Sequence, residues 1–224
     1  MDVYGVPKSN NTAGIILCLV QVLWIGAAFF LVASHFFAHT SFGADVFGVA
    51  AITILTFDLL TFGRFFLTLF VFLKRQSPLD EMVSVSIAFG VYYVGFLYLL
   101  SLGGSPTLVE IGAGILLFAV GSLLNSLSEF QRLRWKQKPE NKGRLCTTGV
   151  FSLTRHPNYF GDVLWVLGFA LVSGNLWSLL IPALLLVFFW KGNIPMQEKH
   201  LVEKYGDQMT AYMASTKSLI PFVL

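Results

Sequence analysis

The chain has 224 residues, of which 55% are hydrophobic and only 12% are charged, and its formal net charge is +3. Its mean hydropathy is +0.71, whereas an ordinary soluble domain has roughly 25% charged residues. This composition excludes a water-soluble globule, a nucleic-acid-binding module and a disordered regulator, and it predicts an all-α polytopic membrane protein.

Four apolar stretches are long enough to cross a hydrocarbon core about 30 Å thick, which takes roughly 20 helical residues. They cover residues 14–37, 46–73, 82–102 and 107–127, and the segments between them contain the turn-forming residues Gly, Pro, Ser and Asp. We therefore expect four transmembrane helices within a single membrane domain, residues 1–224.

A fifth apolar region, residues 160–190, is interrupted by Ser173, Gly174 and Asn175. The interruption leaves arms of about 13 and 15 residues, and each arm would be only about 20 Å long as a helix. We expect a re-entrant helical hairpin that turns at Gly174 and returns to the side from which it entered. The next segment, residues 194–214, has apolar residues at helical spacing with charges between them, which predicts an amphipathic interfacial helix.

The basic residues indicate the orientation of this topology. With the N-terminus in the cytoplasm, fourteen of the fifteen Lys and Arg residues face the cytoplasm, and the remaining one, Arg64, lies inside the second span. The positive-inside rule describes such a bias, so we expect both termini on the cytoplasmic side. The endoplasmic reticulum and another inner membrane of the cell both fit this pattern.

The densest polar segment is the predicted cytoplasmic loop, residues 128–159. It contains seven basic residues and ends in the motif RHPNY, residues 155–159, directly before the apolar hairpin. Topology and anionic lipid account for basic residues in such a loop, but they require no His, Asn and Tyr at this place. The cluster can bind an anion or the polar end of a cofactor, helped by the first N–H groups of the following helix.

The run TGVFSLTRHPNYFGD, residues 148–162, resembles the signature of an integral-membrane superfamily. That superfamily comprises the isoprenylcysteine carboxyl methyltransferases, the phospholipid N-methyltransferases, and the steroid 5-alpha-reductase and sterol reductase enzymes. The likeness extends from Arg132 to the C-terminus and includes the short hairpin, while the first four spans match only in number and hydrophobicity.

The branches of this superfamily use either S-adenosylmethionine or NADPH. The methyltransferases commonly have two adjacent glutamates after the hairpin, where this chain has Gln197 and Glu198. The reductases tend to have Asn before the Tyr and an acid after the Gly, and Asn158 and Asp162 match both positions. The phosphates of NADPH also favour several Arg and Lys contacts, so the resemblance favours the steroid reductase-like branch.

The resemblance implies a reductase that transfers a hydride from NADPH to a carbon–carbon double bond of a lipophilic, steroid-, sterol- or isoprenoid-like substrate. One alternative is an S-adenosylmethionine-dependent methyltransferase of an isoprenylcysteine or lipid. A second alternative is a non-catalytic subunit of a larger membrane complex. The expected partners are the lipophilic substrate, which would enter sideways between the spans, and membrane lipid; nothing indicates nucleic acid or a metal ion.

The resemblance also implies which residues bind the cofactor. Three basic residues are expected at its phosphates: Lys142, Arg144 and Arg155. Four residues are expected to position the ribose or the nicotinamide amide: His156, Asn158, Tyr159 and Asp162. After the hairpin, Glu198 or Tyr205 would close the site.

The group that polarises the substrate is not indicated by the resemblance. The steroid 5-alpha-reductases have a Gln-x-x-Glu pair in an early span for this purpose, and the first four spans contain none. Asp58 is an ionisable residue inside a span, which in lipid indicates either a function or an inter-helix ion pair. A phenol beside a buried acid can donate a proton to an enone oxygen. The candidates for this catalytic role are Asp58, Tyr92, Tyr93 and Glu129.

Overall fold

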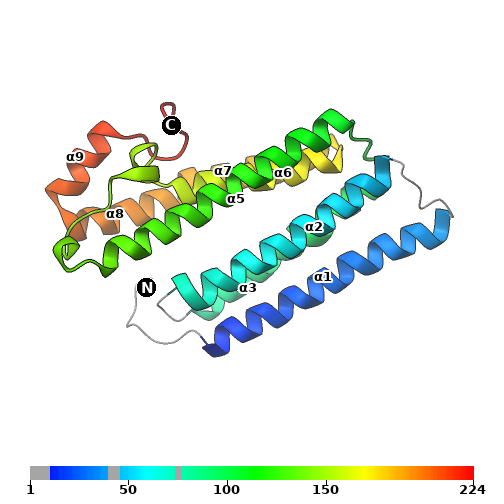
Figure 1. Ribbon diagram of the computed structural model, residues 1–224, viewed down its shortest axis with the longest axis horizontal. Helices are drawn as coiled ribbons and strands as arrows, with labels where there is room; N and C mark the ends of the chain where they lie inside the picture. Colours follow the sequence, from blue (N-terminus) through cyan, green and yellow to red (C-terminus); the bar gives the residue numbers. More distant parts are fainter. Residues whose placement is uncertain (1–10, 40–45, 74–76) are drawn as a thin grey trace. The chain divides into compact units, whose positions relative to one another are not determined.

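The computed structural model describes residues 11–39, 46–73 and 77–224, and no strand occurs in these ranges (Figure 1). Within them, five helices are long and apolar enough to cross a membrane. They are Thr12–His35, Val46–Phe72, Leu79–Ser101, Leu108–Gln137 and Leu176–Tyr205. The predicted all-α polytopic fold is confirmed, with one more membrane-length helix than the four expected.

The chain divides into two compact units. The first consists of Met1–Ile115 and Gly168–Leu179, and the second consists of Leu116–Leu167 and Leu180–Leu224. Helix α5 (Leu108–Gln137) and helix α6 (Pro157–Ser173) each contribute to both units.

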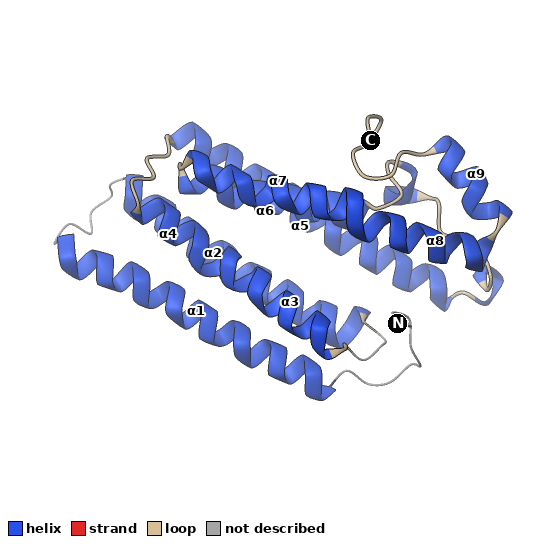
Figure 2. Ribbon diagram, turned by 180° about the vertical axis from the view of Figure 1, so that it is seen from behind, coloured by secondary structure: helices blue, strands red, loops and turns tan. Residues whose placement is uncertain are grey.

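The first unit is built from long apolar helices that lie side by side in both views (Figures 1 and 2). They are α1 (Asn11–His39), α2 (Val46–Leu67) with its π-helical extension (Thr68–Phe72), and α3 (Leu79–Gly90), which continues through a π-helical turn (Val91–Gly95) into α4 (Phe96–Ser101). The ring of Phe169 packs against Phe96 and Phe57 at centroid distances of 5.3 and 5.1 Å. Leu23 and Phe30 are 71% and 75% exposed, as expected for side chains that face lipid.

The second unit contains the rest of α5 and α6, followed by α7 (Leu180–Phe188), α8 (Ile194–Tyr205) and α9 (Asp207–Ser215). Backbone approaches backbone where α5 crosses α6, at Gly121 and Gly161. A Cβ on Gly121 would lie 2.5 Å from the carbonyl oxygen of Gly161, and one on Gly161 would lie 2.6 Å from that of Gly121. Any larger residue at either position would therefore separate the two helices that position the RHPNY motif.

The predicted loop at residues 128–159 begins later than expected, because α5 extends to Gln137. The polar residues that follow Leu127 are mostly good helix formers, and Glu129 forms an ion pair with Arg132 at 3.4 Å, one helical turn away. No Gly or Pro interrupts the run before Pro139. High charge density in this segment was therefore a poor indication that the helix ends.

The predicted turn at Gly174 is present, and its φ of +58° with a hypothetical Cβ 2.2 Å from the nitrogen of Pro106 requires a glycine. The second arm differs from the prediction, because it runs without interruption over the 30 residues Leu176–Tyr205. A π-helical turn, Phe189–Asn193, precedes Pro195 and relieves the clash that Pro causes inside a regular helix. The expected interfacial helix at residues 194–214 is thus two helices, α8 and α9. The re-entrant path and the cytoplasmic termini stay predictions.

Candidate functional site

The segment before α6 is held by the residues that follow α9. The backbone N–H groups of Arg155 and His156 donate to the carbonyl oxygens of Lys217 and Ser218 at 2.9 and 3.1 Å. The hydroxyl of Thr154 also donates to the Ser218 carbonyl, at 2.8 Å. Pro157 then begins α6, where its missing N–H costs nothing. The backbone on both sides of the Arg-His pair is therefore fixed.

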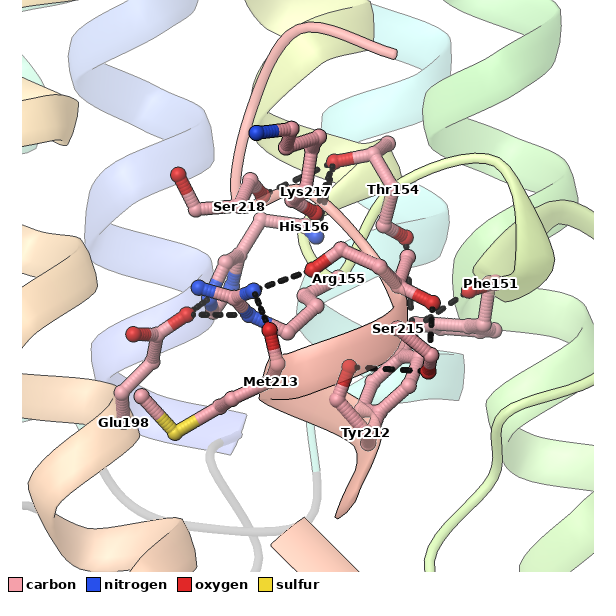
Figure 3. Close-up of polar contacts among 11 residues, drawn as sticks. Phe151, Thr154, Arg155, His156, Glu198, Tyr212, Met213, Ser215, Lys217 and Ser218 are labelled. Carbon is pink, nitrogen blue, oxygen red and sulfur yellow. Dashed lines mark hydrogen bonds and ion pairs between the residues drawn. The ribbon is translucent and has the colours of Figure 1, made fainter. Parts of the chain in front are cut away.

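The guanidinium of Arg155 connects three parts of the second unit (Figure 3). Its Nε donates to Oε1 of Glu198 on α8 at 2.7 Å, and its Nη1 donates to the carbonyl oxygens of Met213 and Thr216 at the end of α9. The side chains of Arg155 and Glu198 are only 10% and 12% exposed. These contacts with protein acceptors occupy the guanidinium, so the arrangement gives Arg155 a structural task in addition to the predicted phosphate contact.

His156 contacts the same carboxylate oxygen (Figure 3). Its Nε2 lies 3.1 Å from Oε1 of Glu198, and its ring stacks on Tyr159 at 5.5 Å, which in turn stacks on Phe189 at 4.3 Å. Desolvation lowers the pKa of His156, although the hydrogen bond and the charge of Glu198 oppose this effect. A neutral imidazole next to a carboxylate carries its proton on Nε2, which leaves the Nδ1 lone pair as an acceptor.

The burial of His156 predicts a loss of stability in mild acid. The unfolded chain takes up a proton at this residue near pH 6.5, its ordinary pKa, whereas the folded protein, with its lower pKa, does not. The free energy of unfolding should therefore fall as the pH drops below about 6.5, by at most about 1.4 kcal/mol per pH unit from this group, and level off below the folded pKa.

Melting temperatures measured between pH 5 and 8, with the His156→Gln variant as control, test this expectation. Gln remains uncharged and can still donate to Glu198, so the variant should lose the part of the pH dependence that His156 contributes. Arg155 and Arg132 add positive charge near the ring. If the melting temperatures of the variant and the parent protein changed equally with pH, His156 would bind its proton equally well in the folded and unfolded states, contrary to this expectation.

Asp162 belongs to a hydrogen-bond network between α5 and α6. Its Oδ1 accepts from the amide of Asn125 at 2.7 Å and from the indole N–H of Trp165 at 2.8 Å. The same amide donates to the carbonyl oxygen of Asn158 at 3.3 Å. This places Asp162 in helix packing beside the Gly121–Gly161 contact. The buried Oδ1 of Asn158 has no hydrogen-bond partner among the described residues, so it can accept a bond from a ligand.

Two further residues organise the site and were not singled out from the sequence. Tyr212 on α9 donates its hydroxyl to the carbonyl oxygen of Phe151, and burial raises its pKa, so it stays protonated. Gln131 on α5 donates to the carbonyl oxygen of Thr148 and accepts from the N–H of Val150. The only signal for Tyr212 was its place on the apolar stripe of an amphipathic interfacial helix, which predicted burial of its ring but no hydrogen bond.

The loop that contains Lys142 and Arg144 is held from both sides by side chains. The amide of Gln208 donates to the carbonyl oxygen of Gly143 at 3.2 Å, and the indole of Trp135 donates to that of Arg144 at 3.2 Å. The side chains of Lys142 and Arg144 are exposed and form no ion pair with a described residue. They are therefore available to an anion, and their contact with a cofactor phosphate stays a prediction.

The four catalytic candidates are divided between the two units. Tyr93 lies in the first unit and donates its hydroxyl to Oε1 of Gln21 at 2.7 Å. Asp58 lies in the same unit and is fully buried, and neither of its carboxyl oxygens has a hydrogen-bond partner among the described residues. Tyr92 is 8% exposed in this unit. Glu129 lies in the second unit and is paired with Arg132 at 3.4 Å.

The tertiary structure thus joins Arg155, His156 and Glu198 into one cluster, with Tyr159 stacked on the histidine. Asp162 lies in the neighbouring network, while Lys142 and Arg144 lie in the loop. Tyr205 packs at the edge of the apolar cluster formed by Phe151, Met209 and Tyr212. Among the described residues, no group of three or more His, Cys, Asp or Glu side chains could hold a metal ion.

Comparison with known proteins connects this arrangement to a family. Residues 82–216, more than half of the chain, match the family model described as "Protein of unknown function (DUF1295)". The match includes the cluster of Arg155, His156 and Glu198, and also Tyr212.

Individual relatives are enzymes of two kinds. "Probable O-methyltransferase ustE" of Ustilaginoidea virens is 41% identical over 78 residues, which are 34% of this chain and 28% of the relative. Protein-S-isoprenylcysteine O-methyltransferase of Schizosaccharomyces pombe is 35% identical over 79 residues, 35% of this chain and 34% of the relative. Human 3-oxo-5-alpha-steroid 4-dehydrogenase 2 is 28% identical over 120 residues, 54% of this chain and 45% of the relative.

This chain covers less than half the length of each of these three relatives. Methyltransferases and a steroid dehydrogenase are nevertheless the two kinds of enzyme expected from the signature around residues 148–162. The resemblance to the methyltransferase and steroid reductase superfamily is therefore confirmed.

Proposed function

The chain belongs to the DUF1295 family, and from that premise we propose that it is a membrane-embedded reductase that uses NADPH to saturate an electron-poor carbon–carbon double bond in a lipophilic substrate. A hydride adds to one alkene carbon and a proton to the other, while negative charge develops on the conjugated carbonyl oxygen. The observation that carries the proposal is Asp58 with Tyr93, an acid and a phenol buried within membrane-length helices.

Burial suits Asp58 to donate a hydrogen bond to a substrate, whereas the Tyr93 hydroxyl donates to Oε1 of Gln21 and would have to exchange that partner for the substrate oxygen. Asp58 is 0% exposed and its carboxyl oxygens have no hydrogen-bond partner among the described residues. An unpaired buried carboxylate is far more costly than a neutral carboxyl group, so we expect Asp58 to be protonated.

A neutral acid and a phenol are useful only where negative charge develops on the substrate. Reduction of an enone creates such a charge on the carbonyl oxygen, and donors placed there lower the barrier. Methyl transfer to a carboxylate develops no new negative charge and needs no proton donor. The Asp58–Tyr93 pair therefore favours reduction over methyl transfer.

Residues of the second unit suit a cofactor with phosphate and amide groups. NADPH, when bound, supplies the hydride. The exposed Lys142 and Arg144 would contact its phosphates, and the unpartnered Oδ1 of Asn158 would accept a hydrogen bond from its carboxamide. Arg155 and His156 would keep Glu198 in a fixed position beside them.

The second candidate function is transfer of a methyl group from S-adenosylmethionine. It is favoured by the identities of 41% and 35% to two relatives named as O-methyltransferases, which exceed the 28% identity to the steroid dehydrogenase. The Glu198 carboxylate suits the positively charged amino group of that cofactor.

Thermal unfolding of the detergent-solubilised protein with each cofactor separates the two functions. A ligand at about 100 times its Kd adds roughly 2.7 kcal/mol to the free energy of unfolding, and we expect NADPH to raise the melting temperature while S-adenosylmethionine leaves it unchanged. An Asn158→Ala variant should show a smaller shift with NADPH. A shift with S-adenosylmethionine alone would replace the reductase by a methyltransferase, and no shift with either would contradict both.

A further inference from the structure

A buried hydrogen bond joins two membrane-length helices of the first unit. The Tyr93 hydroxyl, in the π-helical turn Val91–Gly95, donates to Oε1 of Gln21 on α1 at 2.7 Å. Gln21 is 1% exposed and Tyr93 is 0% exposed. Neither side chain is open to solvent, so each of their polar atoms depends on a protein group or a ligand for a hydrogen bond.

The nitrogen of the same carboxamide has no such bond. Nε2 of Gln21 is buried and has no hydrogen-bond partner among the described residues. The residues one helical turn away on α1, Leu17 and Ile25, are apolar and buried. An unpaired amide donor in apolar surroundings costs free energy, so the observed orientation of the carboxamide is only partly satisfied.

The carboxamide of Gln21 can bond to Tyr93 in two orientations. In the observed one, Oε1 accepts the phenol hydrogen. After half a turn about the terminal side-chain bond, Nε2 would donate to the phenol oxygen instead, because a phenol both donates and accepts. Rotation about this kind of bond is soft. Each orientation has one bond to Tyr93 and leaves one end of the carboxamide unpaired, so the two states are close in free energy.

The two orientations differ in what the Tyr93 hydrogen can do. In the observed state Oε1 of Gln21 binds it, whereas in the rotated state it is free to bind a ligand. The ring itself cannot turn away, because it is fully buried and packs edge-to-face on Phe89 at a centroid distance of 5.5 Å. A ligand with an acceptor oxygen at this place therefore stabilises the rotated state, and a ligand without one does not.

We propose that Gln21 is a positioning residue that controls the Tyr93 hydroxyl: it binds the phenol hydrogen until a ligand carbonyl oxygen displaces it, and then donates from Nε2 to the phenol oxygen. This second bond makes the phenol a better donor, because linked hydrogen bonds polarise one another. The enone as ligand rests on the proposed function, whereas the exchange itself rests on the Gln21–Tyr93 bond and the unpaired Nε2.

Carvone and limonene are matched probes, because carvone has a ring carbonyl where limonene has a methylene group. We expect Gln21→Met to strengthen carvone binding to the detergent-solubilised protein by about two- to ten-fold, since the ligand no longer displaces a neutral hydrogen bond. Limonene binding should stay unchanged. The kcat for reduction of carvone with NADPH should fall by a similar factor, because the phenol loses its Nε2 donor. Loosened packing would not combine tighter binding with slower turnover.

Leu17→Met is the matched control, because Leu17 is one turn before Gln21 and only 3% exposed. It should change neither the affinity for carvone nor kcat. In a Tyr93→Phe background, Gln21→Met should leave carvone binding unchanged, since Gln21 acts through the phenol hydroxyl. Gln21→Leu should reproduce the effects of Gln21→Met, so the test does not depend on the folding of one variant.

Carvone binding that is weaker or unchanged in the folded Gln21 variants would overturn the proposal, as would an effect that persists without the Tyr93 hydroxyl. If carvone binding responds as expected but NADPH supports no reduction of carvone, the role of Gln21 stands and the reductase fails. If Tyr93→Phe slows the reduction and the Gln21 variants bind and reduce carvone like the parent protein, the reductase stands and the role of Gln21 fails.

Discussion

Replacement of Arg155 by Ala is expected to lower the free energy of unfolding by about 3–5 kcal/mol, because the change leaves the Glu198 carboxylate without its strongest partner. The two side chains are 10% and 12% exposed, and their bond is 2.7 Å long. The change also removes the donors to the carbonyl oxygens of Met213 and Thr216, which hold the end of α9. Chemical or thermal unfolding in detergent measures the effect.

A double-mutant cycle with Glu198→Gln separates the pair from other contributions. The double variant should be destabilised by less than the sum of the two single changes, because removing the carboxylate also removes the unpaired charge. Arg134→Ala is the matched control, since Arg134 is exposed and lies 5.0 Å over the ring of Phe130. That change should cost only about 0.5–1 kcal/mol. Additive effects would mean that Arg155 and Glu198 do not interact.

Replacement of Asp58 by Asn or of Tyr93 by Phe is expected to lower kcat for an enone substrate by about 10²–10⁴-fold, the usual contribution of a positioned acid. The KM for NADPH should change little, because both residues are assigned to the substrate. Both substitutions nearly conserve volume, so the packing around these fully buried positions is preserved.

The matched control is Tyr98→Phe, because Tyr98 follows the same run of helix but is 51% exposed. This variant should keep the parent kcat. Rates equal to those of the parent protein in folded Asp58→Asn and Tyr93→Phe variants would remove the pair from the mechanism. A large loss of kcat in the Tyr98→Phe variant would mean that the effect comes from general loosening of the helix.

The fold could be predicted from the sequence wherever a local property decides it. The spans follow from length and hydrophobicity, and the turn at Gly174 follows from a residue that can adopt positive φ. The continuous helix Leu176–Tyr205 was missed because charges after Lys191 indicated a boundary. A π-helical turn before Pro195 removes that boundary, and such a turn has no clear sequence signal.

The candidate site could be predicted in part. The RHPNY motif identified Arg155 and His156, and the position after the hairpin identified Glu198. The sequence did not indicate that one oxygen of Glu198 serves both residues, since they are separated by more than forty positions. The sequence also did not indicate the partners of Asp162, because its hydrogen bonds with Asn125 and Trp165 depend on how closely α5 approaches α6.

The sequence thus sufficed to predict the all-α membrane class, because the free energy of transfer into lipid is approximately a sum over single residues. It also sufficed to predict the superfamily, because the residues of the motif are adjacent in the chain. Only the tertiary structure decided which charges are neutralised. It pairs Arg155 with Glu198 and Arg132 with Glu129. Electrostatic energy depends on the distances between charges, and those distances are set by helix packing between residues far apart in the chain.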